Sequence, residues 1–235
     1  MPILALETAT LVSSVALATE DTLVAELTLQ TKLTHSERLM PHVAAVLDLA
    51  QLKLADISAI AVSIGPGSFT GLRIGLATGK ALAYALKIPL VGVPTLEAIA
   101  FGCPLPGAYL SPLLDAQKGN VYQAVFQSGE NGWQEVVPAR VINCLAALKE
   151  LAELKQPVIV MGEGAVLYRQ QILNCGGRLL LPPPHLIMPR AGSVAFLGRQ
   201  LLASGGAHDV MALEPLYIRR SEAEVLWERR QDRRL

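Results

Sequence analysis

A glycine-rich loop is the clearest candidate for chemistry in this sequence. The loop, Gly65-Pro-Gly-Ser-Phe-Thr-Gly71, stands between an apolar run at 59–64 and a helical pattern at 72–86. Glycines between a strand and a helix can present backbone N–H groups to a phosphate. However, the G-x-G-x-x-G pattern of dinucleotide-binding folds and the P-loop pattern are both absent here. Phosphate binding is therefore not the interpretation we favour.

Close helix packing is the interpretation we favour for this region. Gly71, Gly75 and Gly79 stand four residues apart and form a small-residue ridge on the predicted helix. Such a ridge lets another helix approach, from this chain or from a partner, and Phe69 would then be exposed beside it as an anchor. We expect Gly75→Arg to disrupt pairing with a partner and to leave the lobe folded. The candidate partner-interface residues are Gly65, Pro66, Gly67, Ser68, Phe69, Thr70, Gly71, Arg73, Gly75 and Gly79.

Two acids at the ends of predicted strands are candidates for a ligand cleft. Glu7 ends the apolar run 2–7, and Asp115 follows the run 108–114. In two-lobed α/β proteins such strand ends face the cleft. Taken singly, each acid is better explained as a turn residue.

Metal binding and nucleophilic catalysis have no support in the sequence. His35 and His42 share a helix face but stand about 10 Å apart along its axis, too far to chelate one ion. His185 and His208 are isolated, so we expect surface or capping histidines. The three cysteines include no C-x-x-C pair, and no G-x-S-x-G motif occurs. We predict no metal site and no catalytic residue.

Composition excludes several classes of protein. The chain is 51% hydrophobic and 17% charged, with 20 acids balancing 20 bases. A disordered chain has low hydrophobicity and high net charge, and a protein whose whole surface binds nucleic acid has a basic excess. No apolar stretch reaches the roughly 20 residues of a membrane span, and the N-terminus does not resemble a signal peptide. We expect a cytoplasmic protein with part of its surface covered by a partner.

Strands and helices alternate along the first part of the chain. Residue periodicity predicts the order βββαβαβα, and therefore an α/β layer with parallel pairings. A capping-box pattern, Thr34-x-x-Glu37, begins the first helix, Pro41 predicts a kink or a late start there, and Thr95 is expected to cap the third helix. The predicted strands are 2–7, 12–18, 22–29, 59–64 and 89–93, and the helices are 36–52, 72–86 and a third from 96.

A segment rich in Gly and Pro, 102–107, predicts a boundary between two lobes. Beyond it the pattern partly repeats, so two lobes that share a topology fit better than one continuous sheet. The predicted strands are 108–114, 119–127, 133–137 and 157–161, and the helices are 143–155, 164–174 and 191–204. We assign 1–104 to an N-terminal lobe with the partner interface, 105–218 to a C-terminal lobe and 219–235 to a basic tail. We interpret the tail as a solvated terminal segment, with RNA contact as the alternative.

Several motifs together resemble a known family, the bacterial TsaB (YeaZ) proteins of the threonylcarbamoyladenosine tRNA-modification system. The resemblance runs from residue 3 to about 219, and G-P-G-S-F-T-G-L-R is its most specific part. The motifs that carry it are 3–10 (ILALETAT), 35–41 (HSERLMP), 61–75 (AVSIGPGSFTGLRIG), 92–97 (GVPTLE), 115–122 (DAQKGNVY) and 215–219 (PLYIR).

The resemblance implies a two-lobed ASKHA (actin/Hsp70-like, RNase H-like) fold and a scaffold role. It implies two partners, the catalytic paralogue TsaD and the ATPase TsaE. That system transfers a threonylcarbamoyl group from threonylcarbamoyl-adenylate to N6 of adenosine 37 in tRNAs that read ANN codons. Pairing with TsaD would use the N-terminal lobe around Gly65–Arg73 and the following helix, and a homodimer would form through the same face without TsaD. Contact with tRNA would be indirect.

Departures from the catalytic relatives favour a non-catalytic role. Thr95 and Ile99 stand where TsaD has two metal-binding histidines, and Glu7 stands where the fold's first phosphate motif begins with Asp. The segment 115–117 lacks the Gly pair of the second phosphate motif. The resemblance thus implies no cofactor in the isolated chain, with ATP or ADP only in the complex. The alternatives are an active ASKHA ATPase or kinase and, with least support, a metallopeptidase. The ATPase site would be Glu7, Thr8, Thr10 and Asp115.

Overall fold

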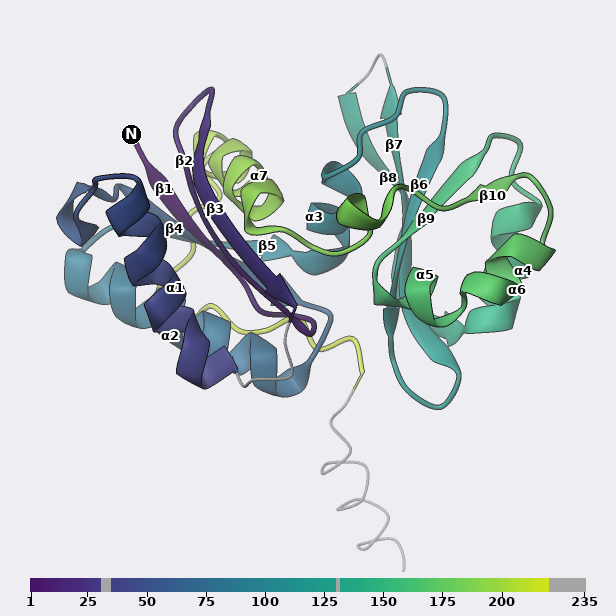
Figure 1. Cartoon of the computed structure of the whole chain (residues 1–235), viewed down its shortest axis with the longest axis horizontal. Helices are drawn as coiled ribbons and strands as arrows, with labels where there is room; N and C mark the ends of the chain where they lie inside the picture. Colours follow the sequence, from purple (N-terminus) through teal and green to yellow (C-terminus); the bar gives the residue numbers. More distant parts are fainter. Residues whose placement is uncertain (31–34, 130–131, 220–235) are drawn as a thin grey trace, which may run out of the picture.

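The chain forms two lobes, each built around a five-stranded sheet (Figure 1). The computed structural model describes residues 1–30, 35–129 and 132–219. The predicted capping residue Thr34 and the predicted tail beyond Arg219 lie outside the described residues. The predicted mixed α/β class with two lobes of shared topology is confirmed, because the two sheets have the same strand order and the same pairing directions.

The first sheet has the order β3-β2-β1-β4-β5. The central strand β1 pairs antiparallel with β2 and parallel with β4, so that Ala5 lies between Ala16 and Ala61. All the residues of β1 and β2 are buried, as expected for strands that are covered on both faces. The predicted order βββαβαβα is confirmed. The strands are β1 Ile3–Glu7, β2 Val12–Ala18, β3 Leu23–Gln30, β4 Ala59–Gly65 and β5 Leu90–Pro94.

Helices cover both faces of the first sheet. α1 (His35–Leu49) and α2 (Phe69–Leu86) pack on one face with the core residues Leu4, Leu6 and Val62. α3 (Thr95–Phe101) and α7 (Ala191–Ala203) pack on the other face (Figure 1). The predicted late start of the first helix is wrong, because α1 begins at His35 and continues through Pro41. None of the helices among the described residues is long and apolar enough to cross a membrane.

The second sheet has the order β10-β9-β6-β7-β8, which repeats the first with β6 in the place of β1. The predicted strand at 133–137 is longer in the structure, and the predicted helix at 164–174 is divided at Tyr168. The elements are β6 Tyr109–Asp115, β7 Asn120–Gly129, β8 Gly132–Asn143, β9 Val158–Met161, β10 Leu179–Leu180, α4 Cys144–Ala152, α5 Glu163–Leu167 and α6 Arg169–Asn174.

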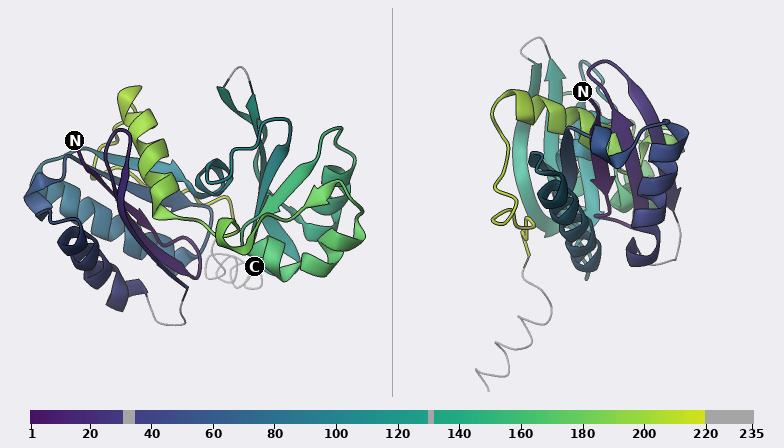
Figure 2. Two further views of the ribbon diagram at one scale, coloured as in Figure 1. Left: turned by 45° about the horizontal axis from the view of Figure 1, so that its top comes forward. Right: turned by 90° about the vertical axis from the view of Figure 1, so that its left-hand side faces the viewer.

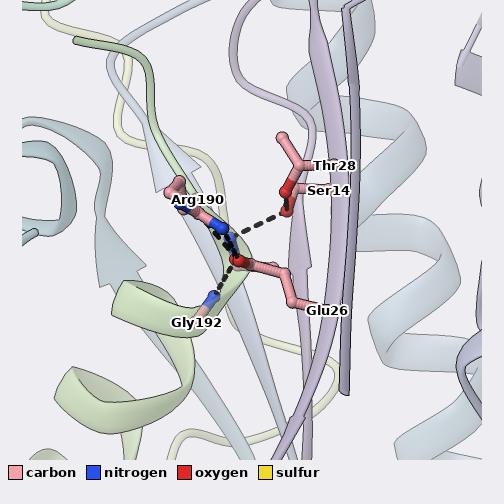
Figure 3. A network of polar contacts seen from close by, with 6 residues as sticks. Ser14, Glu26, Thr28, Arg190 and Gly192 are labelled. Carbon is pink, nitrogen blue, oxygen red and sulfur yellow. Dashed lines mark hydrogen bonds and ion pairs between the residues drawn. The ribbon is translucent and has the colours of Figure 1, made fainter. Parts of the chain in front are cut away.

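The chain returns to the first lobe at α7, so the assignment of 105–218 to the C-terminal lobe is wrong at its end. Val194, Ala195 and Leu197 of α7 pack against the first sheet (Figure 2). A polar network fixes the start of α7. The Glu26 carboxylate of β3 accepts hydrogen bonds from the Gly192 N–H at 2.8 Å and from the Arg190 guanidinium (Figure 3).

The segment after α7 connects the two lobes a third time, after the crossing into β6 and the return at α7. Leu213 is buried in the core of the first lobe, and the Leu216 N–H donates to the Ile64 carbonyl of β4 at 2.7 Å. Ile218 packs on the cluster in which Leu110 and Phe126 of the second sheet meet α3. We call residues 213–219 the interlobe strap. The hydrophobic effect favours this crossing, because each lobe buries one apolar side chain of the strap.

Candidate functional site

A cleft of about 1000 Å³ lies between the lobes. Its walls come from the loops at the ends of β1 and β4, the ends of β3 and β6, the first turn of α2, helix α5 and the segment before α7. We call it the interlobe cleft. Its lining residues are Thr10, Leu11, Gln30, Gly67, Ser68, Phe69, Thr70, Asp115, Ala116, Gln117, Tyr122, Glu163, Val166, Leu167, Pro184, Ile187, Met188 and Arg219.

Glu7 does not line the cleft, because it is fully buried at the end of β1. Its Oε1 accepts a hydrogen bond from the Ala9 N–H at 2.6 Å. Its Oε2 and the nearby Ser63 hydroxyl are buried and have no hydrogen-bond partner among the described residues. Burial raises the pKa of this carboxyl to about 7, although the hydrogen bond from the Ala9 N–H partly opposes the shift. Glu7 is therefore a buried acid that lies outside the lining of the cleft.

The predicted glycine ridge faces the inside of the lobe. A Cβ at Gly71 would overlap the Thr8 carbonyl oxygen, and one at Gly75 would overlap Thr8 Oγ1. The Thr8 hydroxyl donates to the Gly71 carbonyl at 2.8 Å, and a Cβ at Gly79 would lie 3.5 Å from Leu90 and Val62 side chains. The expectation that this ridge is open to a partner is wrong. The glycines instead let α2 approach the end of β1, as the packing interpretation allows within one chain.

The loop before α2 is tied to α3 of the same lobe and to the interlobe strap. Ser68 caps α2 by accepting from the Gly71 N–H at 3.2 Å, and Gly65 N–H donates to Thr95 Oγ1 at 3.1 Å. The predicted capping role of Thr95 is therefore wrong, since its hydroxyl binds the glycine loop instead. Phe69 is half-buried and not exposed, because it stacks on Tyr217 of the interlobe strap with ring centroids 4.1 Å apart.

Arg73 completes this aromatic cluster at the start of α2. Its guanidinium lies 4.7 Å from the centroid of the Phe69 ring, and its Nε donates to the Tyr217 hydroxyl at 3.1 Å. Pro66 is buried, whereas Thr70 is exposed on the cleft wall. Of the predicted interface residues, Ser68, Thr70 and Arg73 are therefore exposed, and the others are half-buried or buried.

Two carboxyl groups from the second lobe face the cleft. Asp115 is exposed at the end of β6, and its Oδ1 accepts from the Gln117 N–H at 2.9 Å. Glu163 begins α5, and its Oε1 accepts from the Asp115 N–H at 3.2 Å. Burial raises the pKa of Glu163, and the negative charge of Asp115 adds to that shift. Sequence reasoning found Asp115 and missed Glu163, although the same rule, an acid just after a buried strand, points to both.

The outer face of α2 is a surface that the glycine pattern did not predict. Ala77, Ala81, Tyr84 and Ala85 are all exposed there, and the exposed fraction of Tyr84 reaches 72%. Helix α1, beside α2 on the same side of the sheet, adds exposed Met40 and Ala44. Small and apolar side chains at helical spacing on an exposed surface indicate a helix-packing interface. The signal was present in the sequence as Ala77, Ala81 and Ala85, spaced like the glycines.

The histidines have structural roles among the described residues. His42 is buried with Nδ1 3.2 Å from the Ser13 hydroxyl, so its predicted surface position is wrong. His35 Nε2 lies 2.8 Å from the Thr10 carbonyl, and the Gly92 N–H donates to His208 Nδ1 at 3.3 Å. Within residues 1–30, 35–129 and 132–219, no group of three or more potential metal ligands is present.

Comparison with known proteins identifies the family of this chain. The family model described as TsaD, tRNA N6-adenosine threonylcarbamoyltransferase, matches residues 23–227. The tRNA threonylcarbamoyladenosine biosynthesis protein TsaB of Bacillus subtilis is 36% identical to the chain over 230 residues, which is 97% of this chain and 98% of that protein. The chain belongs to the TsaB family.

Solved structures confirm the fold of this TsaB-family chain. YeaZ from Pseudomonas aeruginosa matches with a TM-score of 0.75 at 25% identity, covering 92% of this chain and 99% of that one. The ethanolamine utilization protein EutJ from Carboxydothermus hydrogenoformans matches with a TM-score of 0.55 at 13% identity, covering 83% and 90% of the two chains, and shows likeness of fold alone. The predicted two-lobed ASKHA fold is confirmed.

Proposed function

We propose that this chain is a non-catalytic accessory subunit for threonylcarbamoyl transfer to N6 of adenosine 37 in tRNAs that read ANN codons. Its partners in this proposal are TsaD, which carries the catalytic site, and the ATPase TsaE. The observation that carries the proposal is membership of the TsaB family over nearly the whole chain. The exposed apolar face of α1 and α2 supports a subunit that works by pairing.

The pairing surface in this proposal is the outer face of α2 together with α1. This places it on the lobe that the sequence predicted, but on the opposite side of α2 from the glycine ridge. The ridge is filled by Thr8 and the sheet, whereas Ala81 and Tyr84 are open to solvent. In the absence of TsaD, the same face is available for a homodimer, because an exposed apolar stripe favours burial.

The fit of the interlobe cleft to a nucleotide is poor on the side of the first lobe. Glu7 and Thr8 are fully buried, and Thr8 is occupied by its contacts with α2. Of the four candidate cleft residues, Thr10 and Asp115 reach the cleft. We therefore propose that the isolated chain does not bind Mg-ATP tightly and has no catalytic activity alone, and that ATP or ADP belongs to the assembled complex. The proposed location is the cytoplasm, with tRNA contact left mainly to the partners.

Reconstitution tests the accessory role. TsaD, TsaE, threonylcarbamoyl-adenylate and tRNA are combined with and without this chain, and modified adenosine is measured by mass spectrometry of digested tRNA. We expect product formation to require the chain. Full activity without it rejects the proposal, and micromolar Mg-ATP binding with turnover by the isolated chain supports the ATPase alternative instead.

A pair of matched alanine variants tests the surface. Ala81→Arg places a long charged side chain on the outer face of α2, whereas Ala146→Arg places it on an exposed position of α4 in the second lobe. We expect Ala81→Arg to weaken binding of TsaD by about tenfold or more, because disruption of an interface centre removes roughly 2 kcal/mol. Ala146→Arg should bind like the unmodified chain. Equal affinities of the two variants would place the interface elsewhere.

A further inference from the structure

We propose that the C-terminal segment of this same chain, residues 220–235, occupies the interlobe cleft. The proposal is independent of the accessory function, because it concerns the cleft and not the outer face of α2. Three features carry it: the chemistry of the cleft walls, the path of the chain into the cleft, and the residues that follow in the sequence.

The cleft walls expose apolar side chains that nothing among the described residues covers. Leu11, Val166 and Leu167 are 64%, 57% and 61% exposed, and all three line the cleft. Ile187 and Met188 continue the apolar surface on the side of the segment before α7. Apolar surface gathered in a concave site of this size is typical of a binding site and not of random surface.

Acidic groups stand next to this apolar surface. The Asp115 and Glu163 carboxyl groups lie at the second-lobe edge of the cleft, and neither takes part in the two ion pairs of the described residues, Arg140–Glu150 and Arg190–Glu26. The two acids repel each other, and Arg219 is the cation that the described residues place near them, with its guanidinium on the Ala116 carbonyl. A further cation at this edge would relieve more of their mutual repulsion. An occupant with an apolar part and nearby positive charges would satisfy both parts of the site.

The interlobe strap delivers the chain to the cleft. Tyr217 stacks on Phe69, and the Arg219 guanidinium donates to the Ala116 carbonyl, with Phe69, Ala116 and Arg219 all lining the cleft. Residue 220 therefore follows directly from the cleft wall. A tethered segment competes at an effective concentration of about a millimolar or more, so even a weak site would be filled by it.

The residues after the strap have the composition that the cleft requires. Val225, Leu226 and Trp227 form an apolar triplet, and the arginines 229, 230, 233 and 234 follow it. A helical segment would span about 1.5 Å per residue and an extended one about twice that, so the arginines can reach carboxylates across the cleft from the triplet. Residues 229–235 carry these four arginines and one acid, Asp232, so their charge is complementary to Asp115 and Glu163. The other acids of the segment, Glu222, Glu224 and Glu228, precede the arginines.

Tryptophan fluorescence of the full chain tests this proposal. The sequence has two tryptophans, Trp133 and Trp227. Trp133→Phe keeps an aromatic ring beside Phe101 and Phe126 and leaves Trp227 as the reporter. In this background we expect Trp227 emission at shorter wavelength than in a free peptide of residues 220–235, together with several-fold weaker quenching by acrylamide.

Two matched pairs of variants in the same background locate the site. Leu167→Glu changes an exposed leucine of the cleft wall, and Leu173→Glu changes one that is 53% exposed on α6 outside the lining. We expect Leu167→Glu to abolish most of the blue shift and Leu173→Glu to preserve it. Glu163→Gln should weaken the protection against acrylamide by about two- to fivefold, the range of an exposed charge pair. Glu153→Gln, at an exposed position after α4 outside the cleft lining, should not.

Each outcome decides the proposal. Emission like that of the free peptide, or equal effects of Leu167→Glu and Leu173→Glu, overturns it. A blue shift that disappears on dilution indicates docking on a second copy of the chain and also overturns it. A blue shift that is independent of protein concentration and sensitive to Leu167→Glu alone supports it. Activity in the reconstituted modification system is not needed for this readout, so the two proposals fail separately.

Discussion

The two lobes carry acids at equivalent strand ends, yet one acid is sealed inside its lobe and the other faces the cleft. Glu7 ends β1, Asp115 ends β6, and these strands hold the same place in their sheets. Each carboxylate accepts a hydrogen bond from the N–H two residues later, at 2.6 Å from Ala9 and 2.9 Å from Gln117. The local hydrogen bond is therefore the same, although Gln117 and Lys118 have positive φ and residues 8–11 do not. The difference in exposure comes from what covers each carboxylate.

The helix after the neighbouring parallel strand makes that difference. In the first lobe β4 leads to α2, which has 18 residues and whose glycines allow it to pack on Thr8. In the second lobe β9 leads to α5, which has 5 residues and leaves the end of β6 open. Two sheets of the same topology thus have one covered strand-end acid, Glu7, and one exposed strand-end acid, Asp115. We call the ends of β1 and β6 that carry them the closed corner and the open corner. The length and glycine spacing of the crossover helix thus decide whether the strand-end acid is covered or exposed.

The largest effect is expected when the closed corner is forced open. Gly75→Arg places a side chain against Thr8, so we expect it to destabilise the folded lobe by about 3 kcal/mol or more, as severe overpacking does. This reverses the expectation from the sequence that the lobe would stay folded. Chemical denaturation measures the change, with Ala81→Arg on the outer face of α2 as the control. A stable Gly75→Arg chain would show that the corner is not closed.

The second-largest effect is expected in the pH dependence of stability, because the closed corner holds a buried acid, Glu7. The folded-state pKa of Glu7, about 7, exceeds its ordinary value of 4.5, so the folded chain binds more protons than the unfolded one between these values. Stability should therefore fall as pH rises from about 4.5 to 7, by about 3 kcal/mol in total.

A neutral isostere tests this contribution. Glu7→Gln should remove this pH-dependent part of the free energy of unfolding. The stability of the variant should therefore increase relative to that of the unmodified chain as pH rises, in unfolding curves recorded at several pH values. Glu37→Gln, on the exposed surface of α1, is the control. Parallel pH profiles for Glu7→Gln and the unmodified chain would contradict the buried, proton-binding acid.

Removal of the Glu26 network that holds the start of α7 should have a smaller effect on stability. Glu26→Ala leaves the Gly192 N–H and the Arg190 guanidinium without their acceptor, and the Glu26 side chain is 5% exposed. We expect a loss of about 1–3 kcal/mol in the free energy of unfolding. In the second lobe, Glu150→Ala removes a pair whose glutamate is 52% exposed, and we expect less than about 1 kcal/mol. Equal losses would mean that the network of Figure 3 does not hold α7 in place.

The open corner should respond least. Asp115→Asn keeps an oxygen that can accept from the Gln117 N–H, and the side chain is exposed. We expect a change in stability within about 0.5 kcal/mol, measured by thermal unfolding. A large loss would show that Asp115 supports the lobe as Glu7 does.

Much of the fold could be predicted, because local patterns report on burial. The three first strands, the order βββαβαβα and the repeat in the second lobe follow from hydrophobic periodicity. The place of α7 could not be predicted, because its Ala- and Leu-rich pattern shows only that one face is buried. The partner against which it is buried, a sheet formed by residues far earlier in the chain, is a tertiary fact.

The candidate site was likewise predictable in part from the sequence and in part only from the tertiary structure. The motifs around Gly65–Gly71 and at 115–122 identified the family, and the strand-end acid Asp115 identified the cleft, since these are properties of residue type and spacing. Which side of α2 is open, and which of Glu7 and Asp115 is accessible, depended on the tertiary structure. Equal four-residue spacings of glycines and alanines mark two faces of one helix. Only the packing of Thr8 against the glycines decides that the alanine face remains exposed.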